Sequence, residues 1–401
     1  MNEQDQVFTK CAWRLIPFMM LLYVTNYLDR VNVGFAALTM NKDLGFSPSI
    51  YGFAAGIFFL SYALFQVPAN VILERVGARR SVFCIMLTWG ALSAATAFVQ
   101  DPASFYILRF LLGVAEAGFF PGMILYLTFW FPQLYRARFT AIFMAAIPLS
   151  SIFGGPVSGL ILGMDGVAGL RGWQWLFLLE GLPACLLSFA VLKFLPDGPD
   201  SAAWLTSEEK TTIAIRLSAE KPTAKRDLWS GLSDPRVLAL GLAGMGAGFA
   251  SFGSQLWLPQ IIQAMGFSNF TTGFIVGLFN VAGMAAMILW GRSSDRRGER
   301  IWHMVLAWLV TATGLVVVSV AQNHIIVLMA LTLVTVGLVA AFGPFYTLSS
   351  SFLSGPAAAG SIALVNVFAT GLGGFLGPTV VGKLKEQTEI TRLRWQRWLP
   401  R

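Results

Sequence analysis

The sequence predicts an all-α integral membrane protein of two six-helix-type bundles, with only eleven clear transmembrane helices. Three observations predict this fold class. Of the 401 residues, 56% are hydrophobic and 12% are charged, whereas about a quarter of the residues in soluble domains are charged. The apolar residues form stretches of about twenty, the length that a helix needs to cross a bilayer. A charged ten-residue pattern, called the decapeptide below, also occurs twice, at residues 70–79 and 291–300, and each copy closes a long apolar stretch.

The apolar stretches fall into two groups, separated by one long hydrophilic segment. The predicted spans are residues 14–37, 49–73, 80–99, 104–130, 139–163 and 173–195, followed by 236–262, 271–292, 301–321, 324–352 and 360–382. We therefore predict an N-terminal bundle at 1–195, a cytoplasmic linker at 196–235, a C-terminal bundle at 236–382 and a basic tail at 383–401. Within the linker, the segment from Thr206 to Glu220 is expected to form an amphipathic helix.

The basic residues predict the orientation of the chain. With the N-terminus inside, most Lys and Arg lie in inner segments, and the outer loops carry only Lys42 and Arg171. This asymmetry is typical of membrane proteins, so the net charge of +8 does not indicate a nucleic-acid partner. Asp29 and Arg30 interrupt the first span, which lacks a cleavage site and is read as retained. We expect a multi-pass protein of the inner (plasma) membrane with a cytoplasmic N-terminus.

The basic tail has no twelfth apolar span after it. After eleven crossings it should emerge outside, unless the last span does not cross fully. The sequence favours a shortened or altered end, and Thr391–Arg401, with Trp395 and Trp398 among arginines, could lie in the membrane interface.

Motifs for metals, cofactors and catalysis are missing from the sequence. Cys11, Cys84 and Cys185 are solitary, and neither histidine lies near a cysteine. Gly371–Leu372–Gly373–Gly374 fails the dinucleotide pattern because Leu376 stands where glycine is needed, and phosphate-loop and nucleophile-elbow patterns do not occur. We expect no metal, no cofactor and no enzymatic activity.

Charged residues inside the spans indicate the candidate site, because an ion within the hydrocarbon region is costly and usually functional. Arg30 and Arg109 lie about 10 Å and about 8 Å from the outer ends of spans one and four. Two guanidiniums at one depth suit a carboxylate, which arginine binds bidentately. Asp29 and Glu116 are the candidate proton carriers. The alternative is that these four residues form a structural salt-bridge cluster. For Glu180, packing or helix capping is at least as good a reading.

The repeated decapeptide supplies candidate gating residues at the inner ends of spans two and eight. Its acids and arginines, which could bond to neighbouring helix ends in one conformation and release them in another, are Glu74, Arg75, Arg79, Asp295, Arg296 and Arg300. The alternative is that both copies only anchor inner loops by charge. In span five, the small residues at 154–159 could allow sliding contact between helices or simply close packing.

Several motifs resemble the major facilitator superfamily and, within it, the anion:cation symporters that import hexuronates, aldarates, tartrate or phthalate. They are Tyr27–Leu28–Asp29–Arg30–Val31–Asn32, the segments 67–70 and 74–80, the segment 109–122, Gly172–Trp173–Gln174–Trp175 and Gly343–Pro344–Phe345–Tyr346. The resemblance covers residues 10–382. It implies proton coupling by Asp29 and Glu116, and anion handling by Arg30 and Arg109, in a pocket lined by Tyr62, Tyr346 and Asn366. Asn70 and Glu74 depart from the general hinge motif, and Tyr346 stands where relatives often have tryptophan.

We therefore expect a monomeric secondary active transporter that imports a small organic anion together with protons by alternating access. The anion would be a sugar acid, a dicarboxylate or an aromatic carboxylate, and the partners would be protons and membrane lipid. One alternative is a truncated, non-transporting remnant or an acid-binding membrane protein. Another is a drug exporter, against which the two arginines argue.

Overall fold

The computed structural model describes residues 3–219, 235–351 and 364–398, and within them the chain is helical with no strand. Ten described helical segments are long and apolar enough to cross a membrane. The third predicted span corresponds to α3 (Ala78–Thr96), which is not among those ten. The structure thus confirms an all-α membrane fold, and α3 relies on packing rather than on its own hydropathy. It lies along α8, where Gly90 faces Gly181.

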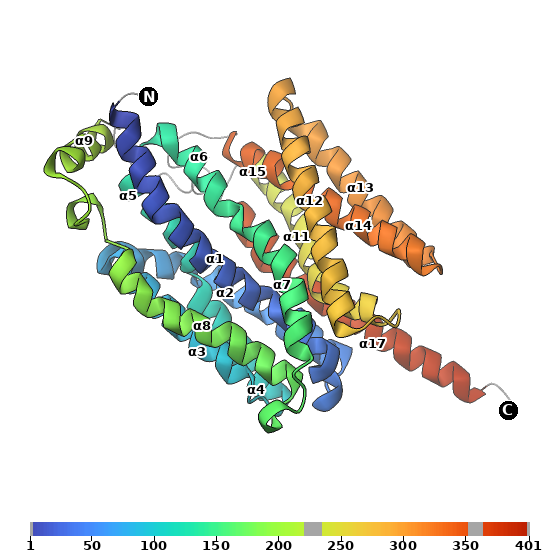
Figure 1. Cartoon of the computed structure of the whole chain (residues 1–401). Coiled ribbons are helices and arrows are strands. Elements are labelled where there is room, and N and C mark those ends of the chain that lie inside the picture. The colour runs from blue at the N-terminus through green and yellow to red at the C-terminus, as the bar shows by residue number, and fades with distance from the viewer. Residues whose placement is uncertain (1–2, 220–234, 352–363, 399–401) are drawn as a thin grey trace.

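The N-terminal half holds α1 to α8 (Figure 1). Its helices are α1 (Glu3–Asp43), α2 (Pro48–Val76), α3, α4 (Pro102–Glu116), α5 (Phe119–Trp130), α6 (Gln133–Met144), α7 (Ala146–Leu162) and α8 (Gly172–Phe194), with a short turn η1 (Val167–Gly169) before α8. Ser47 caps α2 and Asp101 caps α4 with a capping box, so both helices begin where the sequence supplies an N-cap followed by proline.

The C-terminal half holds the remaining described membrane helices. Its helices are α11 (Pro235–Gln263), α12 (Asn269–Arg297), α13 (Ile301–Val320), α14 (His324–Ala340), α15 (Phe342–Ser351) and α17 (Gly374–Trp398), with a π-helical turn η3 (Val367–Gly373) before α17. The last helix continues to Trp398 and so extends beyond residue 382, where the sequence predicts the end of this span. The segment 383–398 extends α17, which leaves the bundle at the end opposite the N-terminus (Figure 1).

Three predicted spans are broken into two helices each. The breaks fall between α4 and α5, at Ala145 between α6 and α7, and at Ala341 between α14 and α15. The first break contains Gly118. This glycine has no side chain and lies against Ala69 of α2. Such interruptions occur in membrane helices where backbone lines a cavity or lies buried in protein. In this chain the second and third breaks adjoin the central cavity described below.

Glycine-rich seams join the two halves at the end away from the N-terminus. In α7, a Cβ added to Gly159 would lie 2.6 Å from the Asn269 carbonyl oxygen, and one added to Gly277 of α12 would lie 2.8 Å from the Ile152 carbonyl. A second seam joins α2 to α17, where a Cβ on Gly56 would lie 2.6 Å from the Phe375 carbonyl. The backbones approach this closely because glycine has no side chain.

The linker begins by docking on the N-terminal half. After η2 (Pro199–Ser201), α9 (Ser207–Ser218) confirms the predicted linker helix and starts with a Thr206–Glu209 capping box. Lys10 donates to Glu209 over 2.8 Å, and this hydrogen bond lowers the pKa of the Glu209 carboxyl. Trp204 stacks on Trp130 with ring centroids 5.6 Å apart. The domain boundaries predicted from the sequence stay a prediction.

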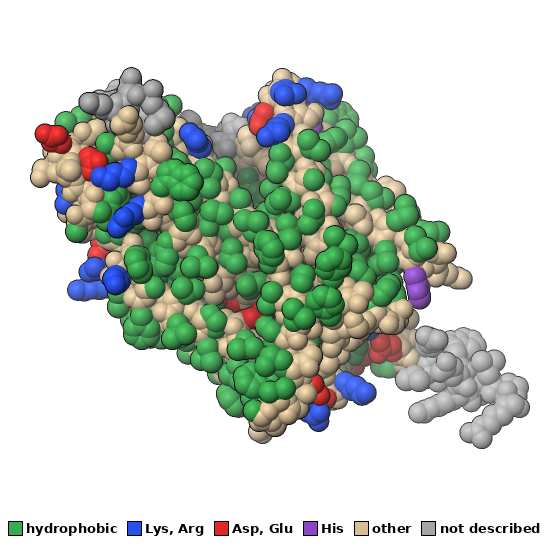
Figure 2. Space-filling model, viewed as in Figure 1, with side chains coloured by type: hydrophobic (Ala, Val, Ile, Leu, Met, Phe, Trp, Pro, Cys, Tyr) green, Lys and Arg blue, Asp and Glu red, His purple; other side chains and the backbone are tan. Residues whose placement is uncertain are grey.

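The surface distribution of side chains suits a membrane-embedded bundle. Figure 2 shows most of the charged side chains of the visible face gathered at its two ends, with hydrophobic side chains between them. Large apolar residues such as Leu186, Leu289 and Val320 are exposed, as expected where lipid replaces water. The same view shows a recess between the halves at the end that holds the N-terminus.

Candidate functional site

A cavity lies between the two halves and is lined by both. Its larger part, of about 480 Å³, is bordered by α1, α6 and α7 on one side and by α11, α12, α14 and α15 on the other. A smaller part of about 140 Å³ adjoins it, since Tyr27, Met144, Ser251 and Tyr346 line both. The residues of α6 and α15 that line it lie next to the breaks at Ala145 and Ala341.

Arg30 supplies the one charged side chain among the described residues that line these two parts of the cavity. It comes from the middle of α1, and its guanidinium lies over the Tyr62 ring, 4.6 Å from the centroid. Arg30 Nη2 is 3.1 Å from Glu116 Oε2, and Nε donates to the same oxygen over 3.3 Å. The described lining of the cavity therefore contains one cation, the Arg30 guanidinium, which forms an ion pair with the Glu116 carboxylate behind it.

Glu116 is fully buried at the last residue of α4, where the fourth span breaks. Its Oε2 accepts hydrogen bonds from Arg30 and from Asn26 Nδ2, the latter over 2.9 Å. Its Oε1 has no hydrogen-bond partner among the described residues. Sequence reasoning missed Asn26, although it stands four residues before Arg30 and hence on the same face of α1. A buried carboxylate is stable beside a cation and amide donors.

Arg109 lies behind this pair and does not line either described part of the cavity. Its guanidinium is 4.7 Å from the Phe58 centroid, and that of Arg30 is 5.6 Å from the same centroid. The structure thus brings the two predicted arginines to one aromatic ring. Arg109 Nε donates to the Ala54 carbonyl over 3.4 Å, while Nη1 and Nη2 lack a partner within the described chain. Of the two arginines, Arg30 lines the described cavity in this conformation and Arg109 does not.

Asp29 lies on another face of α1 and is likewise buried away from both parts of the cavity. Its Oδ1 accepts hydrogen bonds from Asn32 Nδ2 over 3.0 Å and from the hydroxyl of Ser93 on α3. Its Oδ2 has no partner in the described part of the structure. The four predicted ionisable residues therefore form one buried set, but they do not all share the cavity.

The opposite wall carries the predicted residues Tyr346 and Asn366, and Tyr62 lies beside Arg30. Asn366 Nδ2 donates to Gln66 Oε1 of α2 over 3.1 Å and thereby joins the two halves next to the cavity. Gln255 of α11 does the same by donating to the Tyr27 hydroxyl over 3.0 Å. Gln66 was missed by sequence reasoning, since a single amide in a span gives no signal of its partner.

Both copies of the decapeptide pattern end their helix at a glycine with positive φ, but they differ in the conformation of that glycine and in their bonds. Gly77 has φ of 94° and Gly298 has φ of 62°, a region that favours glycine, which explains the glycine in both copies. In the first copy, the backbone N–H of Arg79 donates to Asp197, beyond the end of α8, over 2.9 Å. In the second, Arg300 Nη2 is 2.6 Å from Asp295 within the same motif.

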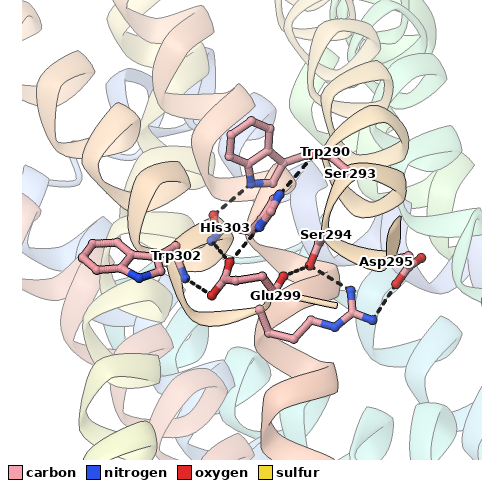
Figure 3. Close-up of polar contacts among 8 residues, drawn as sticks. Trp290, Ser293, Ser294, Asp295, Glu299, Trp302 and His303 are labelled. Carbon is pink, nitrogen blue, oxygen red and sulfur yellow. Dashed lines mark hydrogen bonds and ion pairs between the residues drawn. The ribbon is translucent and has the colours of Figure 1, made fainter. Parts of the chain in front are cut away.

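Further contacts tie the second copy to the start of α13 (Figure 3). Glu299 accepts from the backbone N–H groups of Trp302 and His303 over 2.7 and 3.1 Å, and its Oε2 is 2.9 Å from His303 Nδ1. Trp290 donates to the His303 carbonyl over 2.8 Å. Glu74, Arg75 and Arg296 also lie at these helix ends. The gating role of the six charged residues stays a prediction.

Two halves of membrane helices around a central cavity define a transport protein. The family model of the Major Facilitator Superfamily matches residues 19–378, and the chain belongs to this family. It is 50% identical over 388 residues to a putative tartrate transporter of Agrobacterium vitis, covering 96% of this chain and 86% of the relative. It is 39% identical to a quinolone resistance transporter of Acinetobacter baumannii, covering 96% and 89%.

A solved structure shares the fold. A bacterial homologue of the human lysosomal transporter Spinster, in an inward-facing and occupied conformation, superimposes with a TM-score of 0.80 at 16% identity, over 95% of this chain and 83% of that one. Because the family and its relatives are transporters, the protein is a multi-pass secondary transporter and not an enzyme.

Proposed function

We propose that the protein imports a small organic anion together with protons across the inner membrane, as a monomer with its N-terminus in the cytoplasm. The observation that carries the proposal is Arg30, the one charged residue of the described cavity lining, held by the buried Glu116. A single cation in a largely aromatic and apolar cavity selects for a negatively charged ligand. The name of the Agrobacterium vitis relative, a putative tartrate transporter, supports an organic acid.

The Arg30–Glu116 pair offers a physical route to coupling. A substrate carboxylate that binds Arg30 from the cavity competes with Glu116 for the same guanidinium. A buried carboxylate that loses its cation is stabilised by taking up a proton. Anion and proton would then bind together and leave together, which is the thermodynamic requirement for symport. Arg109 and Asp29 lie close behind and would balance the charge that remains.

The proposal is tested by replacing Arg30 and comparing uptake in proteoliposomes. With tartrate and benzoate as probe anions, we expect Arg30→Ala to abolish pH-driven uptake, because the cavity would present no cation. Arg30→Lys should retain weak uptake, since lysine keeps the charge without the bidentate fork. The second variant is Arg109→Ala, which we also expect to abolish uptake because Arg109 balances the buried acids. Near-normal uptake would remove Arg109 from the site.

Drug export is a second candidate function, favoured by the quinolone resistance relative and by the aromatic lining. The same vesicles separate the two functions. Export predicts that a quinolone accumulates in inside-out vesicles, driven by protons that leave the vesicle. It also predicts that the quinolone competes with neither anion. Import predicts that the anions accumulate in right-side-out vesicles and that Arg30→Ala stops them.

A further inference from the structure

Glu180 is a third buried acid, which the mechanism above leaves unused. It lies in α8, two turns from the start of that helix, and is 6% exposed. Its Oε1 accepts a hydrogen bond from Ser158 of α7 over 2.9 Å, and its Oε2 has no partner among the described residues. Capping of α8 does not explain it, because Arg171 and Gln174 occupy the start of the helix.

Asn32 connects Glu180 to Asp29. The Asn32 amide donates to Asp29 Oδ1 over 3.0 Å, and its side chain also lies beside Glu180. Asp29 and Glu180 also lie close enough for their charges to interact. Four helices bring the cluster together, since α8 packs on α1 and α3 and α7 packs on α1. The cluster therefore lies on the side of α1 that faces away from the cavity.

The cluster is short of hydrogen-bond donors. Asp29 Oδ2, Asn32 Oδ1 and Glu180 Oε2 are all buried acceptors with no partner in the described chain. An ionised carboxylate only accepts hydrogen bonds, whereas a protonated one adds an O–H donor. Because unpartnered buried acceptors are costly, a proton shared by these groups would stabilise the cluster.

The balance of buried charges also favours a protonated acid in this cluster. Among the described residues of this half, the buried carboxyls and guanidiniums belong to three acids and two arginines: Asp29, Glu116, Glu180, Arg30 and Arg109. Arg30 pairs with Glu116, and Arg109 interacts with both Asp29 and Glu116. Among the described residues of α7 and α8, no cation lies close to Glu180. Helix α7 contains no charged residue, while Arg171 and Lys193 stand about 14 Å and about 20 Å away along α8. Arg171 also pairs with Asp43 and Asp165. Arg79 and Arg80 stand at the far end of α3 from Ser93. One acid is in excess, and a buried charge without a partner is very costly.

We propose that Glu180 is a third proton-binding acid of this transporter and that it exchanges its proton with Asp29, with Asn32 positioning the two carboxyls and not itself carrying the proton. That Glu180 binds a proton is inferred from the local contacts alone. That this proton takes part in transport rests on the proposed proton coupling. The proton-binding site formed by Glu180 and Asp29 would lie on the side of α1 away from the cavity, behind Arg30 and Glu116.

Infrared spectroscopy of the purified full-length chain in lipid tests whether Glu180 is protonated. This measurement needs no substrate. The wild type should show a buried protonated-carboxyl band at neutral pH that E180Q loses. Ser188→Ala, which removes a buried hydroxyl that bonds only within α8, should keep it. In D29N the band should disappear at lower pH, because the neighbouring negative charge has gone. A band that survives in E180Q overturns the proposal.

The exchange with Asp29 is tested by measuring proton movement during tartrate or benzoate uptake with a pH-sensitive dye. We expect E180Q to lower the number of protons moved per anion and to shift the pH profile of uptake, while counterflow persists. An unchanged ratio and profile in E180Q would show that Glu180 is a neutral packing residue and would overturn the exchange. If the wild type moves anions without protons, the proposed coupling fails, and the infrared result still decides whether Glu180 holds a proton.

Discussion

Arg30 and Glu116 show at the scale of single residues how one ion pair can serve both binding and coupling. Arg30 faces the cavity and Glu116 lies fully buried behind it. The pair is held by two nitrogens of Arg30 and by Asn26. Removing one partner from a buried pair is far more costly than removing both, so replacements at the two positions should differ in their effects.

Glu116→Gln tests the coupling step. Glutamine keeps the shape of the side chain and can accept from Asn26 and Arg30, but it cannot take up a proton at neutral pH. We expect pH-driven accumulation to be lost while anion exchange across the membrane persists. Accumulation and counterflow of radiolabelled anion in proteoliposomes measure the two properties separately. Wild-type accumulation in this variant would clear Glu116 of a role in coupling.

At the scale of the element, breaks and caps decide where the functional groups stand. The fourth span ends its first helix at Glu116 and the fifth is interrupted at Ala145, both in the N-terminal half. In the C-terminal half, Glu299 lies between α12 and α13. It accepts a hydrogen bond from the first turn of α13 and also contacts the His303 ring (Figure 3). An acid at a helix N-terminus is stabilised by the free N–H groups of the first turn.

The Glu299 cap predicts a pH-dependent contribution to stability. The hydrogen bond from the Trp302 backbone N–H, followed by those from His303, lowers the pKa of Glu299 from its ordinary value of 4.5. A carboxyl whose folded pKa lies below its unfolded pKa stabilises the fold above the unfolded value and loses that contribution as the pH falls through the folded value. We therefore expect Glu299→Ala to unfold at lower temperature than the wild type at neutral pH, and the difference to shrink below about pH 4.

Thermal unfolding in detergent from neutral to acid pH measures this difference. Glu299→Gln is the control, because it retains an acceptor for the Trp302 N–H without the charge and should show a loss that does not vary with pH. A wild-type advantage over Glu299→Ala that grows on acidification contradicts the assignment.

At the scale of the whole molecule, the halves touch at one end and part at the other. The two glycine seams, α7 with α12 and α2 with α17, lie at the end away from the N-terminus. Glu386 of α17 adds a contact there, accepting from Ser47 Oγ and the Ser49 backbone N–H of α2 over 3.2 Å each. Alternating access requires these contacts to open, so they should set the balance between the two conformations.

Gly159→Ala tests the seam between the halves. The new Cβ would lie 2.6 Å from the Asn269 carbonyl and 2.9 Å from Phe270 Cα, closer than real Cβ atoms approach backbone. We expect the variant to favour the conformation in which this end is open, with slower uptake. Gly246→Ala is the matched control, because nothing lies within 4 Å of its Cβ. Labelling of a cysteine placed at Ser49, which keeps its backbone N–H bond to Glu386, from each side of vesicles measures the shift. Equal labelling of the two variants would count against the seam.

Much of the fold followed from the sequence because its causes are local. A run of about twenty apolar residues must form a helix in lipid, where every backbone group needs an internal partner, so the described helices follow the predicted spans. The glycines of the repeated decapeptide marked helix ends where φ is positive. Asp29, Arg30, Arg109 and Glu116 stood out because charge is rare inside spans.

The pairing of those residues was decided only by the tertiary structure. The sequence could not show that Arg30 alone faces the cavity while Arg109 lies behind Phe58, or that Asn26 and Gln66 complete the contacts. It could not show that Glu180 joins Asp29 through Asn32. Periodicity gives the face of each helix, but the rotation and tilt of one helix against another are set by side chains far away in the chain, which meet only when the bundle packs.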